Sequence, residues 1–137
     1  MESNLLDLGA ERAVLAGLFS YGLESYVEVS DIIDHNSFCH QNNQLIYKCI
    51  EKILSKENDV DLPALLSAAN QLGFSETIQT KQELEYINSL MNFPVSKDNV
   101  FHFAAQIKKF EFARKIRSLA GKIGKDIEKI KGDEDID

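Results

Sequence analysis

The chain has 137 residues, of which 44% are hydrophobic, and its formal net charge is −7. This length suits one domain that can bury a real core. No window approaches the roughly eighteen apolar residues of a membrane-spanning helix. The acidic start Met1-Glu2-Ser3-Asn4 lacks the basic and then apolar parts of a signal peptide. We therefore predict a cytoplasmic domain without membrane contact, in which Cys39 and Cys49 remain reduced thiols.

The charge is distributed unevenly along the chain. Residues 1–107 carry six Lys/Arg against fifteen Asp/Glu, a balance of −9. Residues 108–131 carry nine against three, a balance of +6, and residues 132–137 add −4. Because DNA affinity comes mainly from neutralised phosphates, an acidic domain binds a phosphate backbone poorly. We expect weak DNA binding confined to low salt, and interpret the basic stretch as one solvated helix face.

Every clearly periodic segment is helical, and none shows the alternation typical of a strand. The first helix is predicted at 9–20, with Val14, Leu15, Leu18 and Phe19 directed inward, and Gly22 follows its end. A second helix is predicted at 23–33. Its inner face comprises Tyr26, Val27, Val29, Ile32 and Ile33. After a polar break at 34–37, Phe38 is expected to return to the core.

Two further helices form a pair. An apolar stripe over 45–54 has helical spacing, and the polar break 56–59 ends it. Asp61 is placed to cap the next helix by accepting from its first free N–H groups, and Pro63 falls in the first turn, where a missing donor costs nothing. The apolar residues of this helix run from Leu62 to Leu72, and Gly73 ends it.

The last two helices are predicted from their caps. Thr80 and Glu83 form a capping box in which each side chain accepts a backbone N–H, and the helix ends before Pro94. Ser96 caps a final helix with no strong breaker before Gly132. Its first half is rich in aromatic residues and suits a globular core. We assign Val100, Phe101, Phe103, Ala104, Ile107, Phe110 and Phe112 to that core.

The second half of the final helix changes character. Its apolar positions are spaced 4, 3, 4 and 3, which is a heptad seam narrower than a globular core requires. The seam comprises Ile116, Ala120, Ile123, Ile127 and Ile130. Because the few residues that follow are too short to cover it, the seam is our candidate oligomer interface. The fold class predicted is all-α, a compact bundle of five or six helices with a long C-terminal helix forming half of a helical hairpin.

The joint pattern of these residues resembles the N-terminal domain of the DnaB family of replicative DNA helicases. The pattern includes Phe38, Leu45-Ile46, Ile50, Leu54, Val60-Asp61-Leu62, Leu65 and Leu72-Gly73. Upstream it includes the run from Ala10 to Leu18, and downstream Leu84-Glu85-Tyr86-Ile87, Pro94-Val95-Ser96, Asn99-Val100 and Phe103-Ala104. The resemblance covers about residues 9 to 130. His40 and Asn43 stand where Asp and His are more usual, and a Gly pair near Thr80 is absent, as in a divergent, phage-type member.

The resemblance implies an N-terminal collar or assembly domain of a hexameric helicase of the primosome. It implies self-association as a dimer, and as a trimer of dimers in the hexamer, together with docking of primase or a helicase loader during DNA replication. It further implies a RecA-like ATPase domain that is not present in this chain, with its ATP and Mg²⁺, and DNA contact only through the full-length hexamer. The expected division is 1–110 globular collar, 111–131 projecting helix, and 132–137 acidic tail or cut linker.

The sequence gives only weak signals for a metal site, a catalytic site or a nucleotide-binding site. His35, Cys39, His40 and Cys49 offer metal-ligand types without a C-x-x-C or H-x-x-x-H spacing, so we assign neither a metal site nor a Cys–His nucleophile. The chain contains no G-x-x-x-x-G-K-[ST] phosphate cradle. We expect no catalytic residue, no cofactor and no enzyme activity in this chain. A stand-alone helical adaptor that binds a helicase or primase without motor activity stays as the alternative, followed by a small unrelated helical enzyme.

Overall fold

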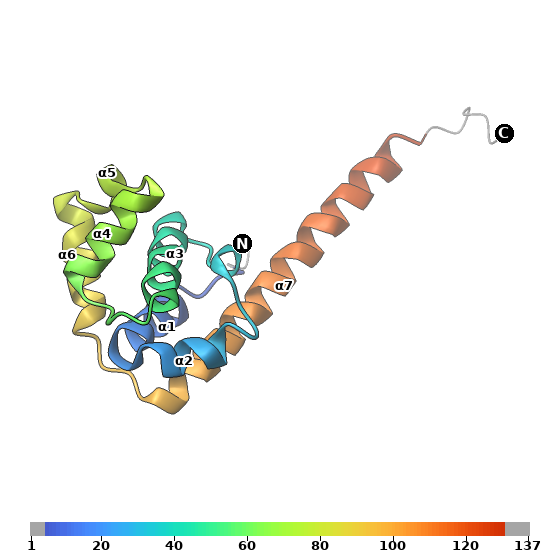
Figure 1. The fold of residues 1–137 in the computed structure, drawn as a ribbon. Helices are drawn as coiled ribbons and strands as arrows, with labels where there is room; N and C mark the ends of the chain where they lie inside the picture. The colour runs from blue at the N-terminus through green and yellow to red at the C-terminus, as the bar shows by residue number, and fades with distance from the viewer. Residues whose placement is uncertain (1–4, 131–137) are drawn as a thin grey trace.

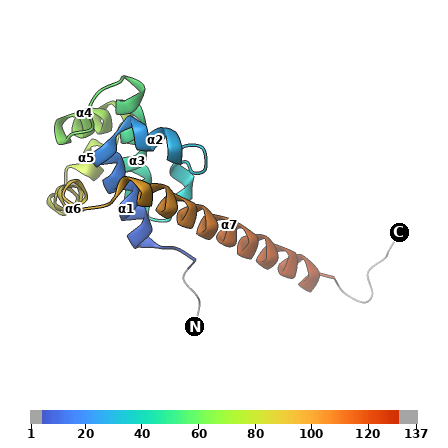
Figure 2. The same ribbon diagram turned by 90° about the horizontal axis from the view of Figure 1, so that it is seen from below.

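The computed structural model describes residues 5–130, and this part of the chain contains helices and loops but no strand. The helices in order are α1 (Leu8–Tyr21), α2 (Leu23–Val29), the short 3-10 helix η1 (His35–Ser37), α3 (Gln41–Ser55), α4 (Leu62–Leu72), α5 (Ser75–Ile78), α6 (Lys81–Met91) and α7 (Lys97–Glu128). Helices α1 to α6 form a globule, and α7 starts against it and projects far beyond it (Figures 1 and 2). The predicted all-α fold with a long C-terminal helix is confirmed.

Helix α1 lies at the centre of the globule. It contacts α2, α3, α6 and α7, and its residues from Ala13 to Leu18 are all buried. Apolar side chains from the surrounding helices close over it. The largest fully buried apolar side chains are Leu15, Leu18, Phe38, Ile46, Tyr47, Ile50, Leu65, Ile78, Ile87 and Leu90. The globule is therefore built around one apolar helix.

The predicted N-caps are confirmed. Asp61 accepts from the backbone N–H of Ala64 at 2.9 Å, Thr80 from Glu83 at 3.2 Å, and Ser96 from Asn99 at 3.4 Å. Gly73 ends α4 in the left-handed region, at φ 84°. The capping box at Thr80 is only half correct, because the Glu83 carboxylate accepts from Asn42 Nδ2 of α3 at 2.8 Å. Glu83 thus links α6 to α3.

Helix α2 is shorter than predicted. It ends at Val29, and a turn carries the chain to Ile33, which is buried. Val27 is 57% exposed, so its assignment to the inner face is wrong, whereas Ser25 on the same helix is fully buried. A helix of seven residues is too short for periodicity to fix its inner face. Helices η1 and α5 are also additions to the predicted set.

Phe38 does return to the core. Its side chain is fully buried and its ring centroid lies 5.1 Å from that of Tyr47. The two thiols are free; Cys39 is exposed and Cys49 is buried. Burial raises the pKa of Cys49 to about 11, so this thiol is unreactive at neutral pH.

A buried carboxylate, Glu11, joins α1 to the start of α3. Its oxygens accept from the backbone N–H groups of Cys39 at 2.7 Å and His40 at 3.3 Å, and from Asn43 Nδ2 at 2.9 Å. The N-cap residue His40 makes no side-chain cap of its own. Glu11 therefore holds the segment that leads into α3, close to the N-terminus of that helix, where an anion also interacts favourably with the helix dipole.

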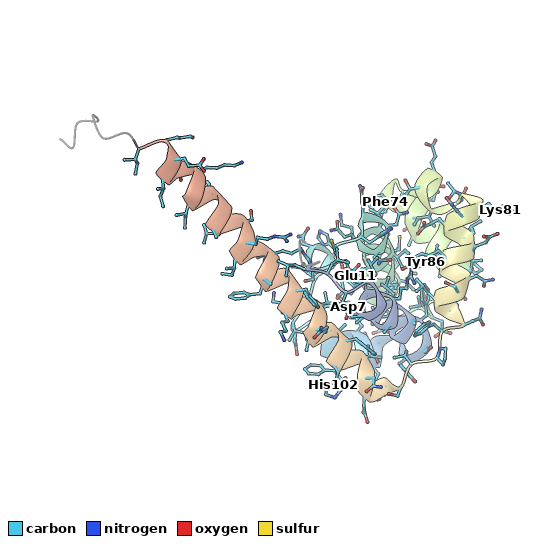
Figure 3. The ribbon with its side chains drawn as sticks, turned by 180° about the vertical axis from the view of Figure 1, so that it is seen from behind. Asp7, Glu11, Phe74, Lys81, Tyr86 and His102 are labelled. Atoms are coloured by element: carbon cyan, nitrogen blue, oxygen red, sulfur yellow. The ribbon has the colours of Figure 1, made fainter. Side chains whose placement is uncertain are left out.

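The same network reaches α6. Asn43 Oδ1 accepts from Tyr86 Oη at 2.6 Å, and the guanidinium of Arg12 lies 5.7 Å from the Tyr86 ring centroid. Figure 3 shows Glu11 and Tyr86 within the globule. A chain of polar contacts thus ties α1, α3 and α6 together beside the apolar core.

Candidate functional site on helix α7

One face of α7 holds the helix to the globule. Val100, Ala104 and Ile107 are buried against it, and α7 packs mainly on α1 and α2. The two helices are in tight contact at Gly17 of α1, where an added Cβ would lie 2.3 Å from Val100 Cγ2. A side chain at position 17 would therefore clash with α7 unless one of the two moved.

Two charged residues fasten α7 at the point where it begins to project. Glu111 is 5% exposed and accepts from Ser37 Oγ at 2.7 Å, while Lys108 and Lys115 lie 3.2 and 3.3 Å from its oxygens. Arg114 donates to the carbonyl oxygens of Leu5 at 2.7 Å and Ser37 at 3.0 Å. The direction of the projecting half is therefore set by hydrogen bonds as well as by packing.

The environment of Glu111 has an electrostatic consequence. Burial alone would raise the pKa of its carboxyl group, but the hydrogen bonds from Ser37, Lys108 and Lys115 outweigh burial and hold the pKa below its ordinary value. The carboxylate is the form that binds these donors. Glu111 therefore stays charged in the fold at neutral pH.

Beyond Arg114 the helix stands in solvent. From Lys115 to Ile130 every residue except Gly124 is exposed, and Figure 3 shows side chains standing away from this stretch on its several sides. The predicted interface residues all lie here. Ile116 and Ile123 are each 50% exposed, Ile127 60% and Ile130 68%, and Ala120 is exposed as well.

The prediction for three apolar residues of α7 is wrong or incomplete. Phe101 and Phe112 were assigned to the core but are 41% and 62% exposed, and Leu119, which is 55% exposed, was absent from the seam. Phe112, Ile116, Leu119 and Ile123 are spaced 4, 3 and 4, which is itself a heptad signal. Both Leu119 and Ala120 satisfy a heptad spacing, and the predicted seam includes only Ala120.

The opposite face of the projecting half is basic. Arg114, Arg117, Ser118, Gly121, Lys122 and Lys125 line a shallow groove of about 460 Å³. At 100° per residue, this face lies on the other side of the helix from Ile116 and Ile123. The helix is thus apolar along one side and cationic along the other.

The rest of the described molecule has few features of a chemical site. Among residues 5–130, His, Cys, Asp and Glu side chains form no group of three or more that could hold a metal ion. The described helices include none that is long and apolar enough to cross a membrane. Many of the large apolar side chains that are exposed lie on α7.

Comparisons with known proteins assign the family. The model described as DnaB-like helicase N terminal domain matches residues 4–109. Replicative DNA helicase DnaB of Buchnera aphidicola subsp. Baizongia pistaciae (strain Bp) is 30% identical over 123 residues, which are 85% of this chain and 24% of that protein. This chain thus spans about a quarter of the length of that relative.

The fold agrees with this assignment. The crystal structure of the N-terminal domain of DnaB helicase from Mycobacterium tuberculosis is similar, with a TM-score of 0.79 at 16% identity, over 90% of this chain and 85% of that one. The family match ends at residue 109, so the globule and the packed half of α7 carry it and the predicted seam lies beyond. The chain belongs to the DnaB-like helicase N-terminal domain family.

Proposed function

We propose that this chain is the collar domain of a hexameric replicative DNA helicase and that it mediates subunit dimerisation through α7. The observation that carries the proposal is the row of exposed isoleucines on a helix fastened firmly to the globule. Each isoleucine contributes roughly 1.5–3 kcal/mol when fully buried. A second copy that covers this side of α7 would remove that apolar surface from water.

Two glycines oppose the association. Gly121 and Gly124 each weaken the helix by about 1 kcal/mol relative to alanine, and no atom lies within 4 Å of the position of an added Cβ at either. We therefore expect concentration-dependent dimerisation of this chain and a firm oligomer, a trimer of dimers, in the full-length protein. The ATPase motor, with ATP and Mg²⁺, is proposed to belong to the full-length protein.

Sedimentation velocity tests the dimer. We expect wild type to shift from monomer towards dimer as concentration rises, and Ile123→Asp/Ile127→Asp to remain monomeric with its globule folded by circular dichroism. Ser118→Asp/Gly121→Asp is the matched control, because it adds the same charge on the opposite side of α7. A wild type that stays monomeric at high concentration, or a control that fails equally, would contradict the proposal.

Docking of a primase or a helicase loader is the second part of the proposal, and membership of the family supports it. Isothermal titration of the chain with the primase and the loader of the same organism tests it. Heat of binding that saturates at a fixed stoichiometry is expected for at least one of them. If neither protein binds at concentrations where the chain is dimeric, the docking role is contradicted and only the assembly role is left.

A further inference from the structure

A cleft opens on the globule where α1 ends, α2 begins and α3 passes into the loop that leads to α4. Its volume is about 390 Å³, within the roughly 300–1,000 Å³ typical of ligand sites. Its apolar lining residues are Leu54, which is buried, Phe19 and Val60, which are half-buried, and Leu23, which is exposed. Its polar lining residues are all exposed and comprise Ser20, Glu57, Asn58 and Asp59. The cleft thus combines an apolar floor with a polar rim.

Glu57, on this rim, ends α3 in a backbone conformation that suits glycine. Its φ is 58°, and it is the one non-glycine residue with a positive φ among residues 5–130. The Glu57 N–H donates to the carbonyl oxygen of Leu54 at 3.0 Å, and the next N–H, of Asn58, donates to that of Ile53 at 3.3 Å. This is the hydrogen-bond pattern of a Schellman helix end. A side chain at this position is strained, because its Cβ crowds the following carbonyl oxygen.

Helix α4 ends in the same way, with glycine at the corresponding position. Gly73 has a φ of 84°, and its N–H donates to the carbonyl oxygen of Asn70 at 3.2 Å. The next N–H, of Phe74, donates to that of Ala69 at 2.7 Å. The two helix ends therefore share one hydrogen-bond pattern, and glycine at residue 57 would relieve the strain in α3. Stability does not account for Glu57, which points to a role for its carboxylate.

The charge of the rim is uncompensated. Glu57 and Asp59 are both exposed, and within the described part of the chain neither side chain forms an ion pair or a hydrogen bond. Lys56, which precedes Glu57, lines a separate hollow between α3 and α4. The C-terminal end of α3 adds the negative pole of its helix dipole. The rim therefore complements a cation, and the apolar floor complements an aliphatic group beside that cation.

We propose that this cleft docks a basic, aliphatic segment of another protein, with a leucine-like side chain in the cleft and a neighbouring arginine or lysine held by Glu57 and Asp59. Val27 lies one turn after Leu23 on α2 and is 57% exposed, so it continues the apolar surface beyond the cleft. A polypeptide covers both parts of this surface, whereas a free small cation does not. The proposal goes beyond the proposed function, because it concerns the globule and shares no residue with the apolar side of α7.

An NMR titration of the isotope-labelled chain with the peptide acetyl-Arg-Leu-Arg-Leu-Arg-amide tests the site. We expect saturable shifts of the backbone amides of Leu23, Glu57 and Val60, and none in the projecting half of α7. Peptides with glutamate in place of each arginine, or with alanine in place of each leucine, should bind several-fold more weakly. Equal binding of either peptide would contradict the proposal. Saturable binding of arginine amide alone would identify a free small cation as the ligand and also overturn it.

Two substitutions separate the charge of Glu57 from its strain. Glu57→Gln removes the charge and keeps the strained backbone, so we expect the Kd for the peptide to rise about three- to fivefold with stability unchanged. Glu57→Gly should weaken binding at least as much and also raise the urea concentration at the midpoint of unfolding, because it relieves the strain. Glu85→Gln, which removes an exposed carboxylate from α6, is the matched control and should change neither quantity.

The outcomes that contradict the proposal differ from those that contradict dimerisation. A Glu57→Gly chain that binds the peptide as tightly as wild type, or that is less stable than wild type, would overturn the role of Glu57. If Glu57→Gly instead lowers self-association in sedimentation, the cleft binds a second copy and the proposed occupant is wrong. If the peptide causes no saturable shift, the site itself is wrong, and the proposed assembly through α7 is unaffected.

Discussion

The tight contact between Gly17 of α1 and Val100 of α7 joins the projecting helix to the globule, and Gly17→Ala tests what this contact contributes to stability. A Cβ at residue 17 would lie 2.3 Å from Val100 Cγ2 and 2.9 Å from Cγ1. Both residues are buried, and the β-branched Val100 has little rotamer freedom within a helix. The added methyl group can therefore be accommodated only if the Val100 side chain or α7 itself shifts.

The expected cost follows from two opposing effects. Overpacking a buried site typically costs about 1–3 kcal/mol, and we expect a clash this short to cost about 3 kcal/mol. Alanine gains about 1 kcal/mol over glycine inside a helix. We therefore expect Gly17→Ala to lower the free energy of unfolding by about 2 kcal/mol, although alanine is the better helix former.

Urea unfolding followed by circular dichroism measures this change, and Val100→Ala supplies the decisive comparison. Removing both methyl groups of Val100 alone should cost about 2 kcal/mol in lost burial and cavity formation. Val100→Ala also removes the clash with a Cβ at residue 17. The double variant Gly17→Ala/Val100→Ala should therefore lose less free energy of unfolding than the two single losses added together, by more than about 1 kcal/mol, which is within the range for contacting residues.

Gly121→Ala is the matched control for helix propensity. No atom lies within 4 Å of the position of its added Cβ, so it should stabilise α7 by up to about 1 kcal/mol. Strict additivity of Gly17→Ala and Val100→Ala would refute the reasoning, because the loss would then arise elsewhere than in this contact.

Two further predictions concern the carboxylates that hold the helices in place. Glu11→Ala should lower the free energy of unfolding in urea by about 3 kcal/mol or more, because it leaves the N–H groups of Cys39 and His40 and the amide of Asn43 without their acceptor. Glu11→Gln, which keeps an acceptor, should cost about half as much, and equal losses would contradict the role of Glu11 as that acceptor. The pKa of Glu111 is lower in the folded state than in the unfolded state. Its carboxylate therefore stabilises the fold in full above the unfolded pKa, which is about 4.3. This stabilisation is lost as the pH falls through the lower pKa of the folded state. Unfolding between about pH 6 and pH 3 should show this loss in wild type. Glu111→Gln should show less of it and the exposed Glu128→Gln should match wild type; an unchanged profile in Glu111→Gln would assign the acid sensitivity to other groups.

The sequence predicted the helices well where a local signal existed. Asp61, Thr80 and Ser96 cap as expected because an N-cap needs only its own side chain and the next turn. Phe38 was found because a lone aromatic residue in a polar break has few alternatives to the core. Such features depend on neighbours in the sequence, and these are visible without a structure.

The misassigned residues depend on distant partners. Glu11 takes its hydrogen bonds from positions 28 to 32 residues away, and Glu83 bonds Asn42, 41 residues away, in preference to its own helix. Phe101 and Phe112 were placed in the core because α7 is apolar on two faces, and periodicity does not tell which face meets the globule. Only the packing of Val100, Ala104 and Ile107 on the globule assigns the other face to solvent.

The exposed half of α7 also raises the question of what keeps it helical. An isolated helix shorter than roughly 12–15 residues is marginal in water, and the stretch from Lys115 to Glu128 is near that limit and contains two glycines. Its hydrogen-bonded start at Arg114 supplies a helical nucleus, which removes the most costly step of helix formation. In the proposed dimer, a second copy of the projecting half would bury the isoleucines and so favour further helix formation in this stretch. We therefore expect the helical content of the projecting half to rise as the chain associates.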